Sequence, residues 1–111
     1  MGRDRIDVLL GTLEMLILQI LSRAPQLHGY DIIERLGDRS GGALQVEEGA
    51  LYPALHRLEL KGWLAGEWRL SPNNRRAKYY RLTARGRRQL EQQKIEWQRV
   101  VGVMARVLEL G

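Results

Sequence analysis

Apolar residues recur with the period of an α-helix in four stretches of this chain, and in a fifth they alternate with polar residues. Between Val8 and Ser22 they cover almost the whole circumference, which predicts a central helix buried on most sides. Pro25 prevents this helix from continuing. A shorter helix is predicted at Gly29–Leu36, followed by a glycine-containing loop at residues 40–42.

A third helix is predicted from about Gly49 to Lys61, because leucines repeat at positions 51, 55 and 58, with the spacing i, i+4 and i+7. Gly62 ends it. Pro53 is compatible with this helix only within its first turn, where no backbone N–H is needed.

The alternating stretch lies between Leu64 and Leu82. Apolar residues alternate up to Leu70, turn-forming residues occupy positions 71–74, and a strand resumes at Tyr79–Leu82, which predicts a β-hairpin. Adjacent strand residues point to opposite faces, so either Tyr79 or Tyr80 must pack in the core or at a dimer contact. The tryptophans at positions 63 and 68 are interpreted as packing anchors.

Thr83 is predicted to be the N-cap of a last helix that continues to about Leu110. Its apolar stripe is wider than packing on one small domain requires, which predicts self-association. The dimerisation residues are expected to be Leu90, Trp97, Val101, Met104 and Leu108. The predicted fold is therefore mainly α, within the α+β class: a winged helix-turn-helix with a two-stranded β-wing over residues 1–83 and a long C-terminal dimerisation helix over residues 84–111.

The charge distribution indicates a polyanionic partner. The 111 residues carry a net charge of +5, but residues 57–99 hold 12 basic and 4 acidic residues, a local charge of +8. Residues 69–88 hold eight basic residues and no acidic one. Such a segment favours nucleic acid over an anionic membrane face or a merely solvated surface.

Cysteine is absent, which excludes disulfides and thiolate metal sites and suits a cytoplasmic protein. The run Val8–Leu21 is too short to span a bilayer and contains Glu14, so no membrane association is expected. Two histidines without clustered carboxylates argue against a metal site, a cofactor site and an enzymatic site.

Candidate DNA contacts lie on the third helix and the hairpin. The helix carries side chains suited to the major groove and a small first turn whose amides could approach a phosphate, while the hairpin tip supplies cations. Contacts to six to ten phosphates would lower the affinity about 10³- to 10⁵-fold between roughly 50 and 200 mM salt. The candidates are Gly49, Ala50, Tyr52, Pro53, His56, Arg57 and Lys61 on the helix, and Arg75, Arg76 and Lys78 on the hairpin.

Arg85, Arg87 and Arg88 occupy the first turns of the last helix, where cations oppose the helix dipole. Phosphate contact, pairing with an acid such as Glu91, or a solvated face would each account for them. Trp97 lies mid-helix and, with Val101, is either a packed interface residue or part of an aromatic slot between two copies.

The chain resembles the PadR family of bacterial transcriptional regulators along nearly its whole length. The resemblance rests on LLGTLEMLILQIL, HGYDIIERL, EEGALYPALHRLELKGWL and RRAKYYRLTARGRRQL. It implies a homodimeric winged-helix repressor that binds a palindromic operator and is released by a small effector. The single C-terminal helix is similar to the compact subgroup, in which aromatic compounds bind between central tryptophans. Where Ala50 stands the family commonly has Ser or Thr, so a side-chain phosphate contact does not transfer to this position.

Three alternative interpretations of the function are a protein-interaction module, a small enzyme and an RNA-binding protein. A protein-interaction module would use the last helix to join a larger assembly, and its basic hairpin would be merely solvated. A small enzyme lacks the clustered catalytic residue types. An RNA-binding role lacks an aromatic-bearing sheet.

Overall fold

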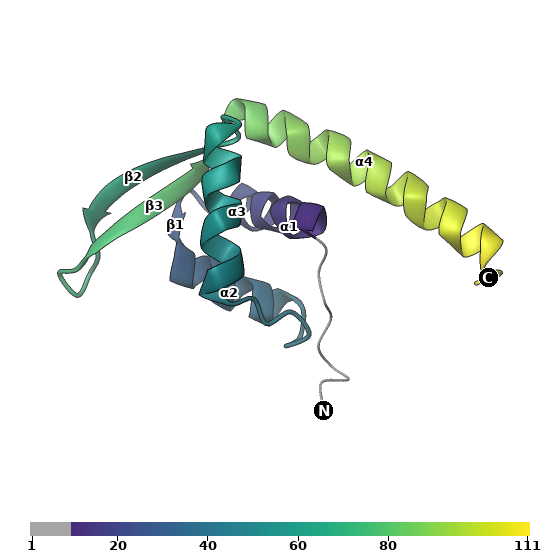
Figure 1. The fold of residues 1–111 in the computed structure, drawn as a ribbon, viewed down its shortest axis with the longest axis horizontal. Helices are drawn as coiled ribbons and strands as arrows, with labels where there is room; N and C mark the ends of the chain where they lie inside the picture. The colour runs from purple at the N-terminus through teal and green to yellow at the C-terminus, as the bar shows by residue number, and fades with distance from the viewer. Residues whose placement is uncertain (1–9) are drawn as a thin grey trace.

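The computed structural model describes residues 10–111, and helix α1 (Leu10–Ser22) lies at the centre of their packing (Figure 1). It packs against α2 (Gly29–Arg39), α3 (Glu48–Leu60), the first part of α4 (Ala84–Val107) and strand β3 (Arg76–Leu82). The predicted central helix is confirmed over its described part, and Val8 and Leu9 lie outside the described residues. The residues with no exposed surface at the centre of the core are Ile17, Leu18, Ile32, Leu51, Ala54, Leu55 and Leu58.

Helix α2 continues to Arg39, beyond the Leu36 expected from the sequence. Gly37 does not stop it, because a glycine inside a helix costs only about 1 kcal/mol relative to alanine. The chain leaves the helix at Ser40 and turns through Gly41 and Gly42, both with positive φ angles.

Helix α3 ends in a Schellman motif. The amide of Gly62 donates to the Glu59 carbonyl at 3.0 Å and that of Trp63 to the Leu58 carbonyl at 3.1 Å, with Gly62 at a φ of 78°. The expectation for Pro53 is wrong, because it is the sixth residue of the helix, in its second turn. The carbonyl at position 49 loses the amide it would accept from, but Gly49 is exposed, so water can reach that carbonyl.

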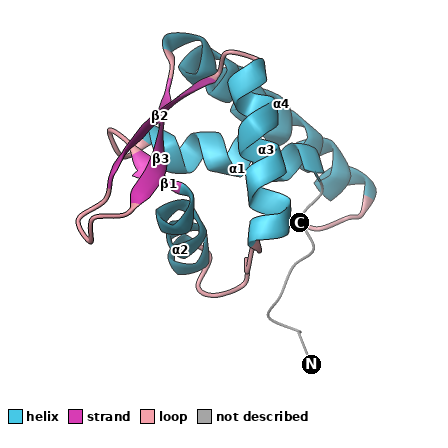
Figure 2. Cartoon of the chain, turned by 60° about the vertical axis from the view of Figure 1, so that its left-hand side comes forward, coloured by secondary structure: helices cyan, strands magenta, loops and turns pink. Residues whose placement is uncertain are grey.

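The predicted hairpin is confirmed as β2 (Leu64–Leu70) paired antiparallel with β3, joined by a turn at residues 71–75 (Figure 2). The expectation of two strands is incomplete, because β1 (Leu27–His28) pairs with the other edge of β3 and gives the order β1-β3-β2. Two residues are too short to show an alternating pattern. One of the two tyrosines was expected to pack in the core, and Tyr80 is the buried one. Trp63 packs against the core, as predicted.

Helix α4 is anchored at one end only. The Thr83 hydroxyl accepts from the Gly86 amide at 3.0 Å, which confirms the N-cap, and donates to the Gly62 carbonyl at 2.7 Å. The helix ends at Val107 rather than near Leu110, and Leu108 is its C-cap. Its C-terminal half projects from the body (Figure 1), so the radius of gyration is 15.3 Å, against about 13 Å for a compact chain of this length.

Candidate nucleic-acid interface

A groove of about 740 Å³ lies between the hairpin, the exposed flank of α3 and the N-terminus of α2. It brings together five of the predicted contact residues from segments far apart in the sequence. The groove is lined by His28, Gly29, Tyr30, Tyr52, His56, Trp68, Ser71, Asn73, Arg75, Arg76, Ala77, Lys78 and Tyr80.

The α3 side of the groove presents Tyr52 and His56, which are exposed and one helical turn apart. The Tyr52 ring lies over Gly29, where an added Cβ would be 2.6 Å from the phenolic oxygen. Partial burial, together with Glu48, raises the pKa of Tyr52. Gly29 therefore allows α2 and α3 to approach closely enough to hold the Tyr52 ring at the edge of the groove.

The first turns of α3 remain accessible. Gly49, Ala50 and Pro53 are exposed, and an added Cβ at Gly49 would meet no atom within 4 Å. Backbone groups at this end of the helix are therefore open to solvent, although none of these three residues lines the groove itself.

The hairpin tip presents free cations. Arg75 and Arg76 are exposed, and neither has an ion-pair partner among the described residues. The Arg76 guanidinium lies 5.2 Å from the ring centroid of Trp68. Trp68 is 56% exposed, so its interpretation as a packing anchor is wrong: its position on β2 lies beyond the part of the sheet that α3 covers.

Lys78 is the third predicted hairpin cation, and its ammonium is already paired. It donates to the Glu59 carboxylate at 2.8 Å, and this hydrogen bond is the main cause of its raised pKa. The pair joins β3 to α3. Lys78 therefore fixes the angle of the hairpin against the helix at the floor of the groove.

Arg57 and Lys61, also predicted to contact DNA, lie on the flank of α3 that faces α1. Arg57 Nε donates to Glu14 at 2.7 Å and Lys61 Nζ donates to the other carboxylate oxygen at 3.1 Å. Neither side chain lines the groove. The structure thus gives both cations a carboxylate partner within the chain.

The sequence interpretation did not include the N-terminus of α2 among the contacts. His28 is its N-cap, and Nδ1 accepts from the Asp31 amide at 3.3 Å. Tyr30, in the first turn, is exposed and lines the groove. Histidine is not among the preferred N-cap residues, so the sequence signal for this helix start was limited to Asp31 in the first turn.

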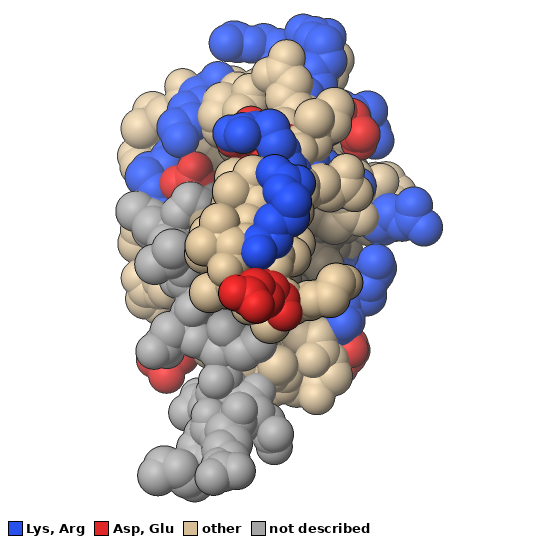
Figure 3. All heavy atoms as spheres, turned by 90° about the vertical axis from the view of Figure 1, so that its right-hand side faces the viewer, with Lys and Arg blue, Asp and Glu red and all other residues tan. Residues whose placement is uncertain are grey.

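Arg85, Arg87 and Arg88 are exposed, and none of them pairs with Glu91 or with another described acid. Pairing, one of the three explanations, is therefore not observed. Figure 3 shows more Lys and Arg than Asp and Glu side chains on the face toward which α4 projects. Positive charge thus extends past the hairpin onto α4.

Four of the five predicted dimerisation residues are exposed along α4 and at its C-cap: Trp97, Val101, Met104 and Leu108 are between 47% and 57% exposed. The assignment of Leu90 to the dimer interface is wrong, because this side chain is 1% exposed and belongs to the core of its own chain. Its spacing from the other apolar residues of α4 predicts an interface position. However, α4 crosses α1 at Leu90, and this contact buries the side chain. Residues further along α4 lie beyond the body and keep their apolar side chains exposed.

Trp97 borders a cavity of about 310 Å³ between α1 and α4. The tryptophan is 47% exposed, while Val101 lies outside the lining. The cavity is lined by Met15, Leu16, Gln19, Leu90, Lys94, Trp97 and Gln98. One wall is therefore aromatic and apolar, and Lys94 adds a cation at its edge.

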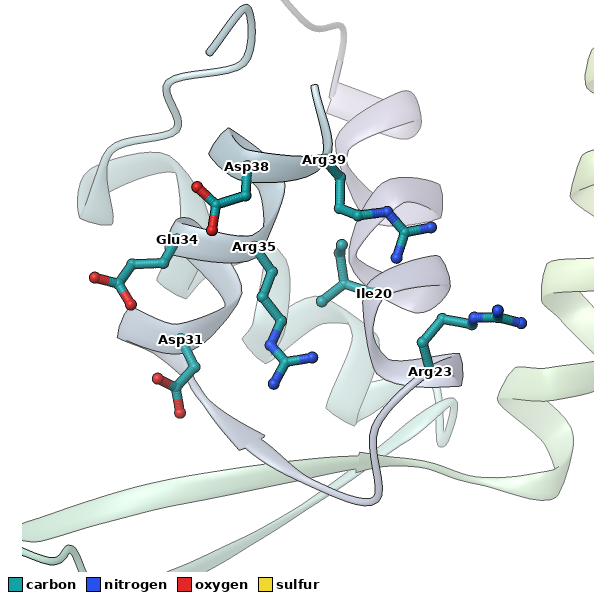
Figure 4. A pocket seen from close by; sticks show the side chains of 7 residues that line it. All are labelled: Ile20, Arg23, Asp31, Glu34, Arg35, Asp38 and Arg39. Atoms are coloured by element: carbon teal, nitrogen blue, oxygen red, sulfur yellow. The ribbon is translucent and has the colours of Figure 1, made fainter. Parts of the chain in front are cut away.

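A further hollow of about 400 Å³ lies between α1 and α2 (Figure 4). The acidic side chains of α2 point to one side of it and the arginines lie on the other side, around Ile20. No ion pair links the two groups. The acids are Asp31, Glu34 and Asp38, and the arginines are Arg23, Arg35 and Arg39.

Within residues 10–111, no group of His, Asp or Glu side chains is arranged to hold a metal ion, and no helix is long and apolar enough to cross a bilayer.

The model of the PadR-like family of transcriptional regulators matches residues 17–92. The chain belongs to this family. PadR-like proteins are regulators that bind DNA rather than enzymes.

The chain is similar to a PadR family regulator of Eggerthella lenta DSM 2243, with 34% identity, a TM-score of 0.78, and coverage of 91% of this chain and 85% of the other. It is also similar to Bacillus subtilis PadR in complex with operator DNA, with 26% identity and a TM-score of 0.68, over 76% of this chain and 46% of that one. An uncharacterised Lysinibacillus sphaericus protein is 28% identical over 105 residues, 95% of each chain. The PadR winged-helix fold expected from the sequence is confirmed.

Proposed function

We propose that this PadR-like regulator binds a specific palindromic sequence of double-stranded DNA as a homodimer and represses transcription in the cytoplasm. One observation carries the proposal: a single groove holds the exposed flank of α3, the N-terminus of α2 and the free arginines of the hairpin. A helix can enter the major groove while nearby cations contact the phosphates. The Bacillus subtilis relative in complex with operator DNA supports duplex DNA as the ligand.

In this proposal Tyr52 and His56 contact base edges. The exposed backbone of Gly49 and Ala50, with Pro53, approaches the sugar-phosphate chain. Arg75 and Arg76 contact phosphates on either side of the site, which adds affinity without adding sequence preference. Arg57 and Lys61 are left out of this set because Glu14 holds both.

The α4 helices pair in the proposed dimer. The exposed face of Trp97, Val101, Met104 and Leu108 is an apolar surface on a projecting helix, and a second copy would cover it symmetrically. Residues 84–111 then act as the dimerisation part and residues 1–83 as the DNA-binding part, although Leu90 ties α4 to the core. Two recognition helices on one face of the duplex require half-sites about 10 to 10.5 bp apart.

A small planar aromatic compound is the proposed effector. The cavity beside Trp97 supports this assignment, because pairing of two α4 helices would bring a second copy of the Trp97–Val101 region toward it. An occupant that alters α4 pairing would alter the half-site spacing and release the operator.

Selection of bound duplexes from a random library tests the proposal. The expected product is a palindrome with half-sites about one helical turn apart. Enrichment of a site without symmetry would argue against the dimer. A protein that binds no duplex and instead forms a hetero-complex through α4 would support the interaction-module alternative.

A further inference from the structure

A buried carboxylate connects α1 to α3. Glu14 is 6% exposed, in a helix whose neighbouring residues form the core. Its two oxygens accept from different cations, Arg57 at 2.7 Å and Lys61 at 3.1 Å. A buried carboxylate without a partner is strongly unfavourable, so Glu14 holds both cations in place.

The two cations are directed away from the groove by the geometry of α3. Tyr52, His56 and Glu59 follow one another at i, i+4 and i+7 along the flank that faces the groove and the hairpin. Arg57 and Lys61 are also i, i+4, but Arg57 lies about 100° around the helix from His56. Arg57 Nη2 is buried and has no hydrogen-bond partner among the described residues, so this guanidinium nitrogen faces the protein interior.

Cations on a recognition helix affect specific and non-specific binding differently. A phosphate contact strengthens binding to every sequence, and each one steepens the salt dependence of log K by about 0.9. Two additional contacts would steepen it by about 1.8, an extra loss of about 12-fold in affinity between 50 and 200 mM salt. Neutralising two cations within the protein therefore lowers binding to unrelated DNA.

We propose that Glu14 is a positioning residue that sets the discrimination between the operator and other DNA. It withholds Arg57 and Lys61 from the phosphates and fixes the rotation of α3, so that Tyr52 and His56 face the groove. The inference rests on the proposed DNA-binding function, because discrimination requires a preferred duplex.

The test compares Glu14→Gln with wild type by fluorescence anisotropy, using the selected duplex and a scrambled duplex of equal length between 50 and 200 mM salt. Glu34→Gln is the matched control, since this exposed glutamate has no ion-pair partner among the described residues and its loss gives the same net charge. Circular dichroism at the same concentration verifies that each variant is folded.

For Glu14→Gln, binding to the scrambled duplex should strengthen and its salt slope should steepen by up to about 1.8. Binding to the selected duplex should weaken about 5- to 150-fold at 200 mM salt, equivalent to losing one good base contact. Glu34→Gln should change the salt slope on either duplex by much less than about 0.9, the value for one phosphate contact. Two results would overturn the inference. One is a folded Glu14→Gln protein whose affinity falls by the same factor for both duplexes, and the other is a Glu14→Gln protein that binds as Glu34→Gln does.

A second variant, Arg57→Gln, tests the same point without emptying the Glu14 site, because Lys61 remains paired. The salt slope on the scrambled duplex should stay unchanged, whereas Arg75→Gln should make it shallower by about 0.9. Equal slope losses for the two variants would show that Arg57 contacts phosphate and would refute the inference. Failure of the wild type to bind any duplex would remove the proposed function itself, whereas selective wild-type binding with unaffected variants would remove only the role of Glu14.

Discussion

The first turn of α4 packs at Gly86 against the backbone of Trp63, just after α3, so Gly86→Ala tests this contact. Helix propensity alone predicts that this replacement stabilises the protein by about 0.5–1 kcal/mol, since Gly86 lies in the first turn of α4. The structure predicts the opposite sign. A Cβ at Gly86 would lie 2.1 Å from the Trp63 carbonyl oxygen and 2.9 Å from its carbon.

The size of the effect follows from what must move. Contacts below 3.0 Å essentially do not occur, so the first turn of α4 would have to retreat by about 1 Å from a backbone carbonyl. Overpacking of this kind costs about 1–3 kcal/mol, and weakening the Gly86 hydrogen bond to Thr83 adds about 0.5–2 kcal/mol. A net destabilisation of about 2–4 kcal/mol is expected.

Urea unfolding followed by circular dichroism measures this difference, with protein concentration held constant because self-association would add to the apparent stability. Gly37→Ala is the control: this glycine is also helical, and its added Cβ would have its nearest neighbour at 3.8 Å. The control should be stabilised by about 0.5–1 kcal/mol. If Gly86→Ala is as stable as wild type or more so, the close contact between α4 and Trp63 is refuted.

Three further predictions concern the hairpin arginines, Trp97 and Lys78. Charge reversal of both Arg75 and Arg76 should weaken binding to all duplexes and make the salt slope shallower by about 1.8 or more, and an unchanged slope in an anisotropy titration would remove the wing from the proposed interface. Trp97→Ala should abolish calorimetric binding of planar aromatic compounds while sedimentation still shows a dimer, and a wild type that binds none would contradict the effector proposal. Because the Glu59 hydrogen bond raises the pKa of Lys78 above 10.5, the stability it contributes should be present below that pH and decline as the pH rises through the raised value. The difference in unfolding free energy between wild type and Lys78→Met should therefore shrink in alkaline solution, and a constant difference would show that the ion pair contributes nothing.

The sequence pattern was sufficient for the elements that bury a repeating apolar face. The leucines of α3, the near-complete apolar circumference of α1 and the cap at Thr83 act locally, so their spacing predicts the helices. The turn at residues 71–75 is similarly local, because Asn74 adopts a φ of 63°, which asparagine tolerates well. These features required no knowledge of distant partners.

The errors came from contacts between distant segments. Nothing near Arg57 in the sequence indicates that Glu14, 43 positions away, holds its guanidinium. Leu90 has the spacing of an interface residue, and only the crossing of α4 over α1 makes it a core residue. His28 was likewise assigned no role in the site, because β1 is too short to show an alternating pattern. Periodicity identifies which residues need cover, but not which part of the chain provides it.

Strand β1 has a consequence for how this regulator can diverge. His28 pairs with Tyr79 in the sheet and also caps α2, so the wing and the start of α2 are joined at one residue. A single insertion at Leu27–His28 would shift the register and turn His28 to the opposite face. Insertions at the exposed tip, residues 72–74, would disturb no pairing with β1. Among descendants of this sequence, length changes should therefore accumulate at the wing tip, and the distance that the wing reaches along the duplex is the property that can change most readily.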